Sequence, residues 1–276
     1  MATCTFHPDR ETFRSCSRCG RPACYECLID APVGAQCVAC VRESRPAASQ
    51  QLKMKLAEPL LVTKLIIATL AAVHFYGLAR QGGSGDVLSG TSTWLVNNFA
   101  LYGPSVKSGE WYRIITSGFL HGSLLHLGFN SFAIWNLGRT LEGAIGRWRY
   151  AALFFVSVLG GSAGALLLSP NVPTIGASGG AFGLMAAAVV GMHARGVPMR
   201  ANGWLPPMVI NLLFTVSIPG ISIGGHLGGI VAGGIVGYVI IGRRMRNRQI
   251  DIGVLVAVGV MAVAIALAAA QRTVGG

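Results

Sequence analysis

Apolar residues dominate the chain from about residue 60 onward, in seven segments separated by polar or glycine-rich stretches. Most of these segments are long enough to cross a hydrocarbon core of about 30 Å as helices. The pattern therefore predicts an all-α polytopic membrane protein with seven spans. The segments lie near residues 60–79, 122–141, 149–169, 178–194, 203–219, 222–242 and 252–270.

The long connection between the first two segments, about residues 80–121, mixes glycine and serine with aromatic residues. Tryptophan and tyrosine favour the membrane–water interface. We therefore expect part of this connection to rest in the outer leaflet, the alternative being a solvated loop.

Composition and charge support a membrane protein and predict its orientation. Charged residues make up 12% of the 276 positions, whereas a soluble domain would carry about 25%. The net charge of +12 could suggest a nucleic-acid partner, but 17 of the 22 basic residues fall on one predicted side of the membrane and four on the other. By the positive-inside rule, we expect a multi-pass plasma-membrane protein with a cytosolic N-terminus, an outer C-terminus and no nucleic-acid partner. The abundance of arginine, alanine and glycine is typical of a high-GC bacterial genome.

All seven cysteines lie between residues 4 and 40, in pairs with a two-residue spacer, and a histidine completes the eighth position. Eight such ligands match two tetrahedral zinc sites with four nitrogen or sulfur ligands each. Disulfides in a secreted domain are the alternative, but an odd cysteine count and the lack of a visible signal peptide oppose it. We therefore expect two structural Zn²⁺ in a cytosolic module, held by Cys4, His7, Cys16, Cys19, Cys24, Cys27, Cys37 and Cys40.

These patterns divide the chain into four parts. We expect a double-zinc module over residues 1–42, a polar linker over 43–58, a six-span core over 59–245, and an additional transmembrane helix with the C-terminus over 246–276. Because every predicted zinc ligand is used, the module has no open catalytic position. Its expected role is to bind a cytosolic protein partner or to regulate the core.

A serine among glycines marks the start of the fourth apolar segment. Ser178 follows a loop that contains two prolines, and small residues recur at every fourth position from Gly179 to Gly191. The segment is shorter than the hydrocarbon core is thick. Ser178 is therefore expected below the outer surface, at a helix N-terminus that favours a developing negative charge.

The sixth apolar segment carries a second stripe of small residues, with His226 beside its first glycine. Small residues four positions apart allow membrane helices to approach closely, and such an approach would let Ser178 and His226 share a hydrogen bond. No Asp or Glu occurs between Gly143 and Ile250. We therefore predict a Ser–His dyad in which His226 acts as general base and then as general acid. The stripe consists of Gly225, Gly229, Gly233 and Gly237.

Three polar residues stand at the outer end of the second apolar segment: His121, His126 and Asn130. Polar side chains at membrane depth are costly and usually functional. His126 and Asn130 share a helix face and can donate to an oxyanion beside the backbone N–H of Ser178. A hydrogen-bonded clamp between helices is the alternative interpretation.

From about Trp111 to Gly237 the chain resembles the rhomboid intramembrane serine proteases. The match consists of several short motifs. The sequence departs from the family in one of them, because Gly225 stands where the family more often has alanine. Gly176-Ala177-Ser178-Gly179 is similar to the nucleophile motif, Gly225-His226-Leu227-Gly228-Gly229 with Gly233 to the histidine span, and His126-x3-Asn130 to the oxyanion pair, with His121 as a further family histidine. Trp111-Tyr112-Arg113 resembles the motif of the first outer loop, and Glu142-x3-Gly146-x2-Arg149 the structural motif after the second span.

The resemblance implies a six-helix bundle, to which this chain adds a seventh C-terminal transmembrane helix. It implies cleavage of single-pass membrane substrates within or near the bilayer, by a dyad and without a catalytic cofactor. It also implies substrate access beside a mobile fifth span, which here contains the breakers Pro206, Pro207 and Pro219. Structural roles are implied for Trp111, Arg113, Glu142, Gly176, Gly179, Gly229 and Gly233.

The order of the cysteine pairs resembles a B-box-type zinc finger. That resemblance implies that the first pair binds zinc with the third and the second with the fourth, while pairing of consecutive pairs stays open.

Three functions are consistent with these patterns. The leading hypothesis is an intramembrane serine endopeptidase acting on transmembrane proteins. The second is a non-catalytic relative that binds membrane helices, and the third is a transporter or channel regulated by the zinc module. Non-catalytic relatives typically lack the serine or the histidine, and both are present here. The transporter does not explain why a serine, two histidines and an asparagine are expected at one depth.

Overall fold

A computed structural model describes residues 2–30, 34–43, 60–80, 92–218, 220–243 and 247–273. The chain forms two compact units, Met1–Glu58 and Pro59–Gly276. Apart from Glu43, the predicted linker lies outside the described residues, as do Pro219 and residues 244–246 of the basic cluster.

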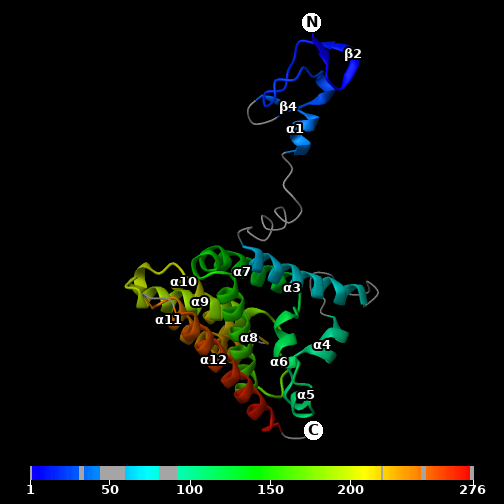
Figure 1. The fold of residues 1–276 in the computed structure, drawn as a ribbon. Helices are drawn as coiled ribbons and strands as arrows, with labels where there is room; N and C mark the ends of the chain where they lie inside the picture. Colours follow the sequence, from blue (N-terminus) through cyan, green and yellow to red (C-terminus); the bar gives the residue numbers. More distant parts are fainter. Residues whose placement is uncertain are drawn as a thin grey trace. The chain divides into compact units, whose positions relative to one another are not determined.

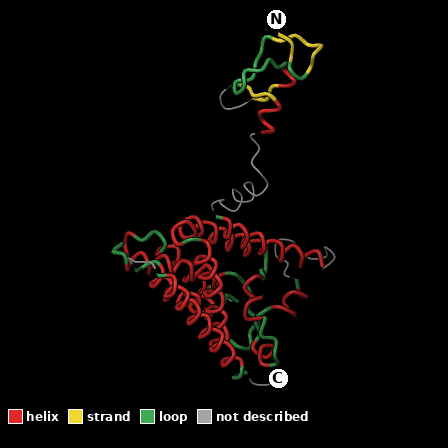
Figure 2. The backbone as a smooth tube through the Cα atoms, in the orientation of Figure 1, coloured by secondary structure: helices red, strands yellow, loops and turns green. Residues whose placement is uncertain are grey.

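The described part of the N-terminal unit consists of two short hairpins and two short helices around a core made mostly of cysteines. The hairpins pair β1 (Ala2–Cys4) with β2 (His7–Thr12) and β3 (Leu28–Asp30) with β4 (Ala35–Cys37), both antiparallel. Figure 2 shows these strands in yellow. The helices are the 3-10 turn η1 (Tyr25–Cys27) and α1 (Val38–Glu43).

In its described residues, the second unit has seven principal helices, one for each predicted apolar segment. They form a bundle (Figure 1). Four of the helices in the described residues, α3, α8, α11 and α12, are long and apolar enough to cross a membrane, and α9 and α10 are shorter apolar helices. The chain is thus a multi-pass membrane protein. The helices are α3 (Leu61–Arg80), α7 (Leu124–Ile145), α8 (Arg147–Leu168), α9 (Ser178–Ala194), α10 (Leu205–Ser217), α11 (Ile223–Ile240) and α12 (Arg248–Ala270), with a 3-10 turn η3 (Met199–Ala201) before α10.

Short helices α4 (Thr93–Phe99), α5 (Gly103–Lys107), α6 (Arg113–Thr116) and η2 (Ser117–Phe119) form the described part of the connection between α3 and α7. Arg113 organises them: its side chain is buried, pairs with Glu110 and donates to the carbonyl oxygens of Ala100 and Asn97 at 2.9 and 2.7 Å. Trp111, for which the resemblance implies a structural role, is 65% exposed. An exposed tryptophan within this connection fits a position at the membrane–water interface.

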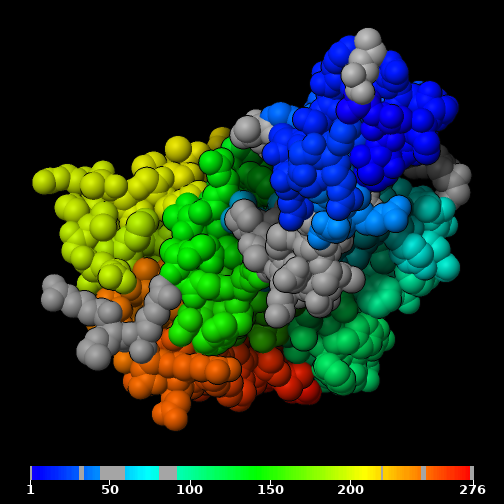
Figure 3. Space-filling view, turned by 45° about the horizontal axis from the view of Figure 1, so that its top comes forward, coloured from blue at the N-terminus to red at the C-terminus, as the bar shows by residue number. Residues whose placement is uncertain are grey.

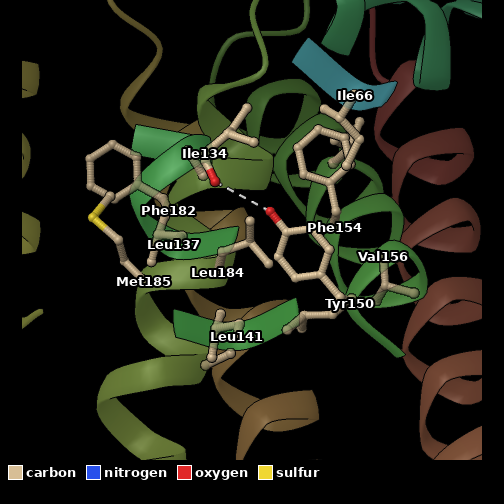
Figure 4. Packing of buried hydrophobic residues seen from close by; sticks show 14 of the residues in the cluster. Ile66, Ile134, Leu137, Leu141, Tyr150, Phe154, Val156, Phe182, Leu184 and Met185 are labelled. Atoms are coloured by element: carbon tan, nitrogen blue, oxygen red, sulfur yellow. Dashed lines mark hydrogen bonds between the residues drawn. The ribbon is translucent and has the colours of Figure 1, made fainter. Parts of the chain in front are cut away.

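Large apolar side chains fill the space between α7, α8 and α9. Tyr150 and Phe154 of α8 are fully buried and pack against Ile134, Leu137 and residues of α9 (Figure 4). The hydroxyl of Tyr150 donates to the carbonyl oxygen of Ile134 at 3.4 Å, so its polar atom has a partner in the core. This cluster holds α9 in position behind the site described below.

Close helix packing at glycine positions brings α11 against two neighbours at once. A Cβ atom at Gly229 or Gly233 would overlap the backbone carbonyl of Gly179 or Gly183 in α9, so only glycine permits this approach. On another side of α11, Gly228 is equally close to Gly160 of α8. The sequence indicated the contact with α9, but not the second glycine face toward α8.

Glu142 and Arg149 belong to one predicted motif but have different partners. The buried carboxylate of Glu142 accepts hydrogen bonds from the backbone N–H groups of Val62 and Thr63, each at 2.9 Å, and from the Thr63 hydroxyl at 2.7 Å. It therefore caps the N-terminus of α3, where a negative charge is favourable. Arg149 forms an ion pair of 2.8 Å with Asp251, which is 2% exposed and lies in α12. This pair ties the seventh helix to α8.

Candidate active site

A cavity of about 910 Å³ opens in the helical unit between the starts of α7, α9 and α11 and one face of α10. The residues that line it include Ser178, His226, His126 and Asn130. Four residues that the sequence analysis selected thus share one cavity.

Ser178 and His226 lie within hydrogen-bonding distance. The Oγ of Ser178, the first residue of α9, is 2.8 Å from Nε2 of His226 in the first turn of α11. His226 is 6% exposed, and its ring stacks on Phe182 with centroids 4.2 Å apart. Because Phe182 is one helical turn after Ser178, α9 supplies both the hydroxyl and the surface against which the imidazole rests.

The loop before Ser178 is held by backbone hydrogen bonds to the connection that precedes α7. Thr174 and Leu101 exchange two such bonds, of 2.9 and 3.0 Å, and the N–H of Gly176 donates to Ser117 at 2.9 Å. Gly176 has a φ of +125°, which L-residues with side chains rarely adopt, and a Cβ there would meet the ring of His126 at 2.9 Å. Glycine at this position therefore allows the turn and the approach of His126.

His126 and Asn130 lie on the cavity side of α7, one turn apart. The backbone N–H of Gly122 lies 3.4 Å from Nδ1 of His126, so this nitrogen accepts and the proton of a neutral ring resides on Nε2. The Asn130 amide donates to the carbonyl oxygen of His126 at 3.0 Å. His121 is buried, and its ring lies 5.0 Å from that of His126 between centroids. The three polar residues thus form one group, with two of them lining the cavity.

Two contacts of His226 were not anticipated from the sequence: the stacking of Phe182 and a hydrogen bond with Thr215. The Oγ1 of Thr215, in α10, is 2.6 Å from Nδ1 of His226. Phe182 could have been found as the residue four positions after Ser178. Thr215 could have been suspected as a polar residue within an apolar span, but its partner depends on how α10 packs.

The N-terminal unit gathers its eight predicted ligands into two groups that can each hold a metal ion, with all ligand atoms of a group within 4.8 Å of one another. The first ligand pair joins the third, and the second joins the fourth, as in the cross-braced arrangement. All seven cysteines are free thiols. The groups are Cys4, His7, Cys24 and Cys27, and Cys16, Cys19, Cys37 and Cys40.

The geometry and chemistry of both groups suit a thiolate-binding metal. In a tetrahedral site with metal–sulfur distances of about 2.3 Å, neighbouring sulfur atoms lie about 3.8 Å apart. The Sγ atoms of Cys19 and Cys37 are 3.8 Å apart. The backbone N–H of Cys37 donates to Cys16 and lowers the pKa of that thiol to about 6. Burial, with the neighbouring thiols Cys24 and Cys4, raises the pKa of Cys27 to about 12, so a cation is needed to ionise it at neutral pH.

With this geometry established, the chain can be compared with known proteins. Residues 108–243 match the family model described as the rhomboid domain. The chain carries a rhomboid domain. This domain spans α6 to α11 and includes Ser178, His226, His126 and Asn130.

Curated proteins similar to this chain include the rhomboid protease GluP of Bacillus subtilis, which is 33% identical over 174 residues, or 62% of this chain and 33% of that protein. Rhomboid-type serine protease 2 of Emericella nidulans is 32% identical over 134 residues, 45% of this chain and 26% of that protein. Inactive rhomboid-related protein 2 of Caenorhabditis elegans is 28% identical over 191 residues, 63% of this chain and 52% of that protein. The chain thus spans between about a quarter and a half of these relatives, which include proteases and an inactive member.

Proposed function

We propose that the rhomboid domain of this chain is an intramembrane serine endopeptidase with Ser178 as nucleophile and His226 as general base and acid. One observation carries the proposal: the 2.8 Å distance between Ser178 Oγ and His226 Nε2 in a cavity that also contains two candidate oxyanion donors. A nucleophile within hydrogen-bonding distance of its base is the arrangement that serine-type acyl transfer requires.

In the proposed reaction, His226 Nε2 accepts the hydroxyl proton of Ser178 while Oγ bonds to the carbonyl carbon of the scissile peptide. The carbonyl oxygen becomes an oxyanion, stabilised by the backbone N–H of Ser178 at the start of α9, the amide of Asn130 and the Nε2–H of His126. Protonated His226 then gives its proton to the leaving amine as the C–N bond breaks. Water hydrolyses the acyl-enzyme on Ser178 in a second round, with His226 again as base.

The proposed substrates are single-pass membrane proteins that reach the cavity sideways from the bilayer, between α7 and α10. Phe129 of α7 and Phe214 of α10 line the cavity yet are 73% and 57% exposed. In Figure 3 the part of the chain around α10 is yellow and lies at the left edge of the molecule. Exposed apolar side chains at the rim of a cavity that holds the polar residues Ser178, His226 and Asn130 suit a site that a transmembrane segment approaches from lipid.

We further propose a plasma-membrane location, with the N-terminus cytosolic and the C-terminus outside, on the distribution of basic residues. The N-terminal unit would then hold two structural Zn²⁺ in the cytosol, through the two four-ligand groups, and bind a cytosolic protein partner. The thiol-rich ligand sets favour zinc.

A second candidate function is favoured by the similarity to an inactive rhomboid-related protein: binding of membrane helices without cleavage. Under this alternative the hydrogen bond between Ser178 and His226 would be a structural contact. Reactivity of Ser178 separates the two functions.

The test is labelling with a fluorophosphonate probe, which reacts with activated serines. We expect the wild-type protein in proteoliposomes to be labelled, and both Ser178→Ala and His226→Ala to be unlabelled, because the first lacks the nucleophile and the second lacks its base. Ser222→Ala is the matched control, since Ser222 lines the same cavity but its hydroxyl accepts a hydrogen bond from the backbone N–H of Gly225 at 3.0 Å, as the N-cap of α11. Labelling that persists in Ser178→Ala, or a folded wild type that never labels, would overturn the proposal.

A further inference from the structure

The ring nitrogen of His226 that points away from Ser178 has a hydrogen-bond partner on another helix. Nδ1 lies 2.6 Å from Oγ1 of Thr215, and both residues are buried, at 6% and 2% exposure. The same hydroxyl lies 2.8 Å from the carbonyl oxygen of Asn211, one turn earlier in α10. Thr215 therefore sits between a backbone acceptor and the histidine.

These two contacts determine where the histidine carries its proton. A threonine hydroxyl has one hydrogen, and the Asn211 carbonyl can only accept, so the hydroxyl donates to Asn211 and accepts from Nδ1–H of His226. A neutral imidazole has one N–H. With that hydrogen on Nδ1, Nε2 presents its lone pair to the hydroxyl of Ser178, which is the tautomer that a general base needs.

We infer that Thr215 is a positioning residue for the proposed reaction: it holds His226 in the tautomer and orientation that accept the Ser178 proton. The inference rests on the proposed function. In Ser-His-Asp triads a carboxylate on Nδ1 does this, but this chain has no Asp or Glu between Gly143 and Ile250. A hydroxyl supplies the same acceptor without the cost of a charge within the bilayer.

Threonine and serine in apolar helices often bond back to the carbonyl one turn earlier, and this chain contains other examples. The Ser217 hydroxyl donates to Leu213 at 2.8 Å in the same helix, on the exposed side. That habit accounts for the bond from Thr215 to Asn211. It does not account for a buried contact of 2.6 Å with the histidine that faces the nucleophile.

Thr215 also links the histidine to the position of α10. It is the buried residue among the 13 of this helix, all of which are described, whereas Leu213, Phe214 and Val216 are 57–60% exposed. A membrane helix that buries so few side chains against its neighbours is held weakly by van der Waals packing. Displacement of α10 would remove the acceptor from Nδ1, so His226 is set for proton transfer only while α10 lies against α11.

The test compares variants that differ at the hydroxyl. Thr215→Val and Thr215→Ala remove it and Thr215→Ser keeps it, while Ser217→Ala removes the same type of bond from the exposed side of α10. Steady-state cleavage of a reporter transmembrane substrate in proteoliposomes gives kcat and KM, fluorophosphonate labelling gives the reactivity of Ser178, and thermal unfolding reports folding. We expect kcat and the labelling rate of Thr215→Val and Thr215→Ala to fall by about 10- to 100-fold with little change in KM. Thr215→Ser and Ser217→Ala should stay within about threefold of wild type.

Each outcome is decisive for one of the two proposals. A folded wild type that neither cleaves nor labels would refute the proposed function itself. An active wild type with unchanged kcat and labelling in the folded hydroxyl-free variants would overturn the role of Thr215. An equal loss of kcat in Thr215→Ser and Thr215→Ala would also overturn it, because those two side chains differ only in the hydroxyl oxygen.

Discussion

The side chain of Asn130 both forms a hydrogen bond within α7 and lines the cavity. Its amide has two hydrogens, and one of them is donated to the carbonyl oxygen of His126 at 3.0 Å. That bond restrains the side chain on the face of α7 that lines the cavity. A restrained donor is effective for an oxyanion because no energy is needed to orient it when charge develops.

Replacing Asn130 with alanine tests this role. Loss of one oxyanion donor is expected to lower kcat by on the order of 10- to 1000-fold, measured by steady-state cleavage of a reporter substrate. Asn136→Ala is the matched control, because Asn136 makes the same bond to the preceding turn of α7, at 2.8 Å to Phe132, on an exposed face. Unchanged turnover in folded Asn130→Ala would remove Asn130 from the proposed mechanism.

At the scale of helices, the distance between Ser178 and His226 depends on the packing of α9 against α11. The two residues stand at the N-terminal ends of these helices, and Gly229 and Gly233 of α11 lie against the backbone of Gly179 and Gly183 in α9. Close backbone approach at small residues is how membrane helices gain packing energy. Each glycine pair therefore contributes to stability and to the geometry of the site.

The variants Gly233→Ala and Gly234→Ala compare a glycine in close backbone contact with α9 with a neighbouring glycine that has room for a methyl group. A methyl group at Gly233 would overlap the Gly183 carbonyl, whereas at Gly234 it would meet Val190 and Ala186 at 3.8 and 4.0 Å, ordinary contact distances. We expect Gly233→Ala to cost about 1–3 kcal/mol of unfolding free energy and to slow fluorophosphonate labelling, and Gly234→Ala to change neither. Equal thermal stability and labelling of the two variants would contradict this packing.

At the scale of the whole molecule, the two units have separate cores and separate chemistry. The N-terminal unit is built on its metal-ligand groups, since the buried apolar residues in its described part are cysteines and Ala23. The residues that line the cavity all belong to the second unit. The fold of the first unit is therefore expected to depend on metal, and that of the second is not.

Metal analysis and chelation test this separation. Purified wild-type protein is expected to contain two zinc ions per chain, and a strong chelator should remove them and unfold the N-terminal unit. Protease sensitivity of residues 1–43 would report that unfolding, while fluorophosphonate labelling of the same sample should persist. Cys16→Ser is expected to lower the zinc content and leave labelling intact. A metal-free, folded N-terminal unit would refute the zinc proposal.

Much of this protein could be predicted from local sequence patterns. The seven helices follow from the apolar segments, because a backbone in lipid must satisfy its hydrogen bonds within one element. The ligand pairs follow from the two-residue spacing of the cysteines. The rhomboid domain was anticipated from short motifs around Ser178, His226 and Asn130, and its presence was confirmed.

Only the tertiary structure decided which of these elements meet. It joined the first ligand pair, Cys4 and His7, to the third, although the spacing also allowed consecutive pairing. It showed that Arg149 pairs with Asp251 of α12, and that Glu142 caps the N-terminus of α3. It placed Thr215 against His226, across the turn between α10 and α11. A sequence pattern determines the face that a helix presents, but the partner of a buried polar group depends on how separate helices pack in three dimensions.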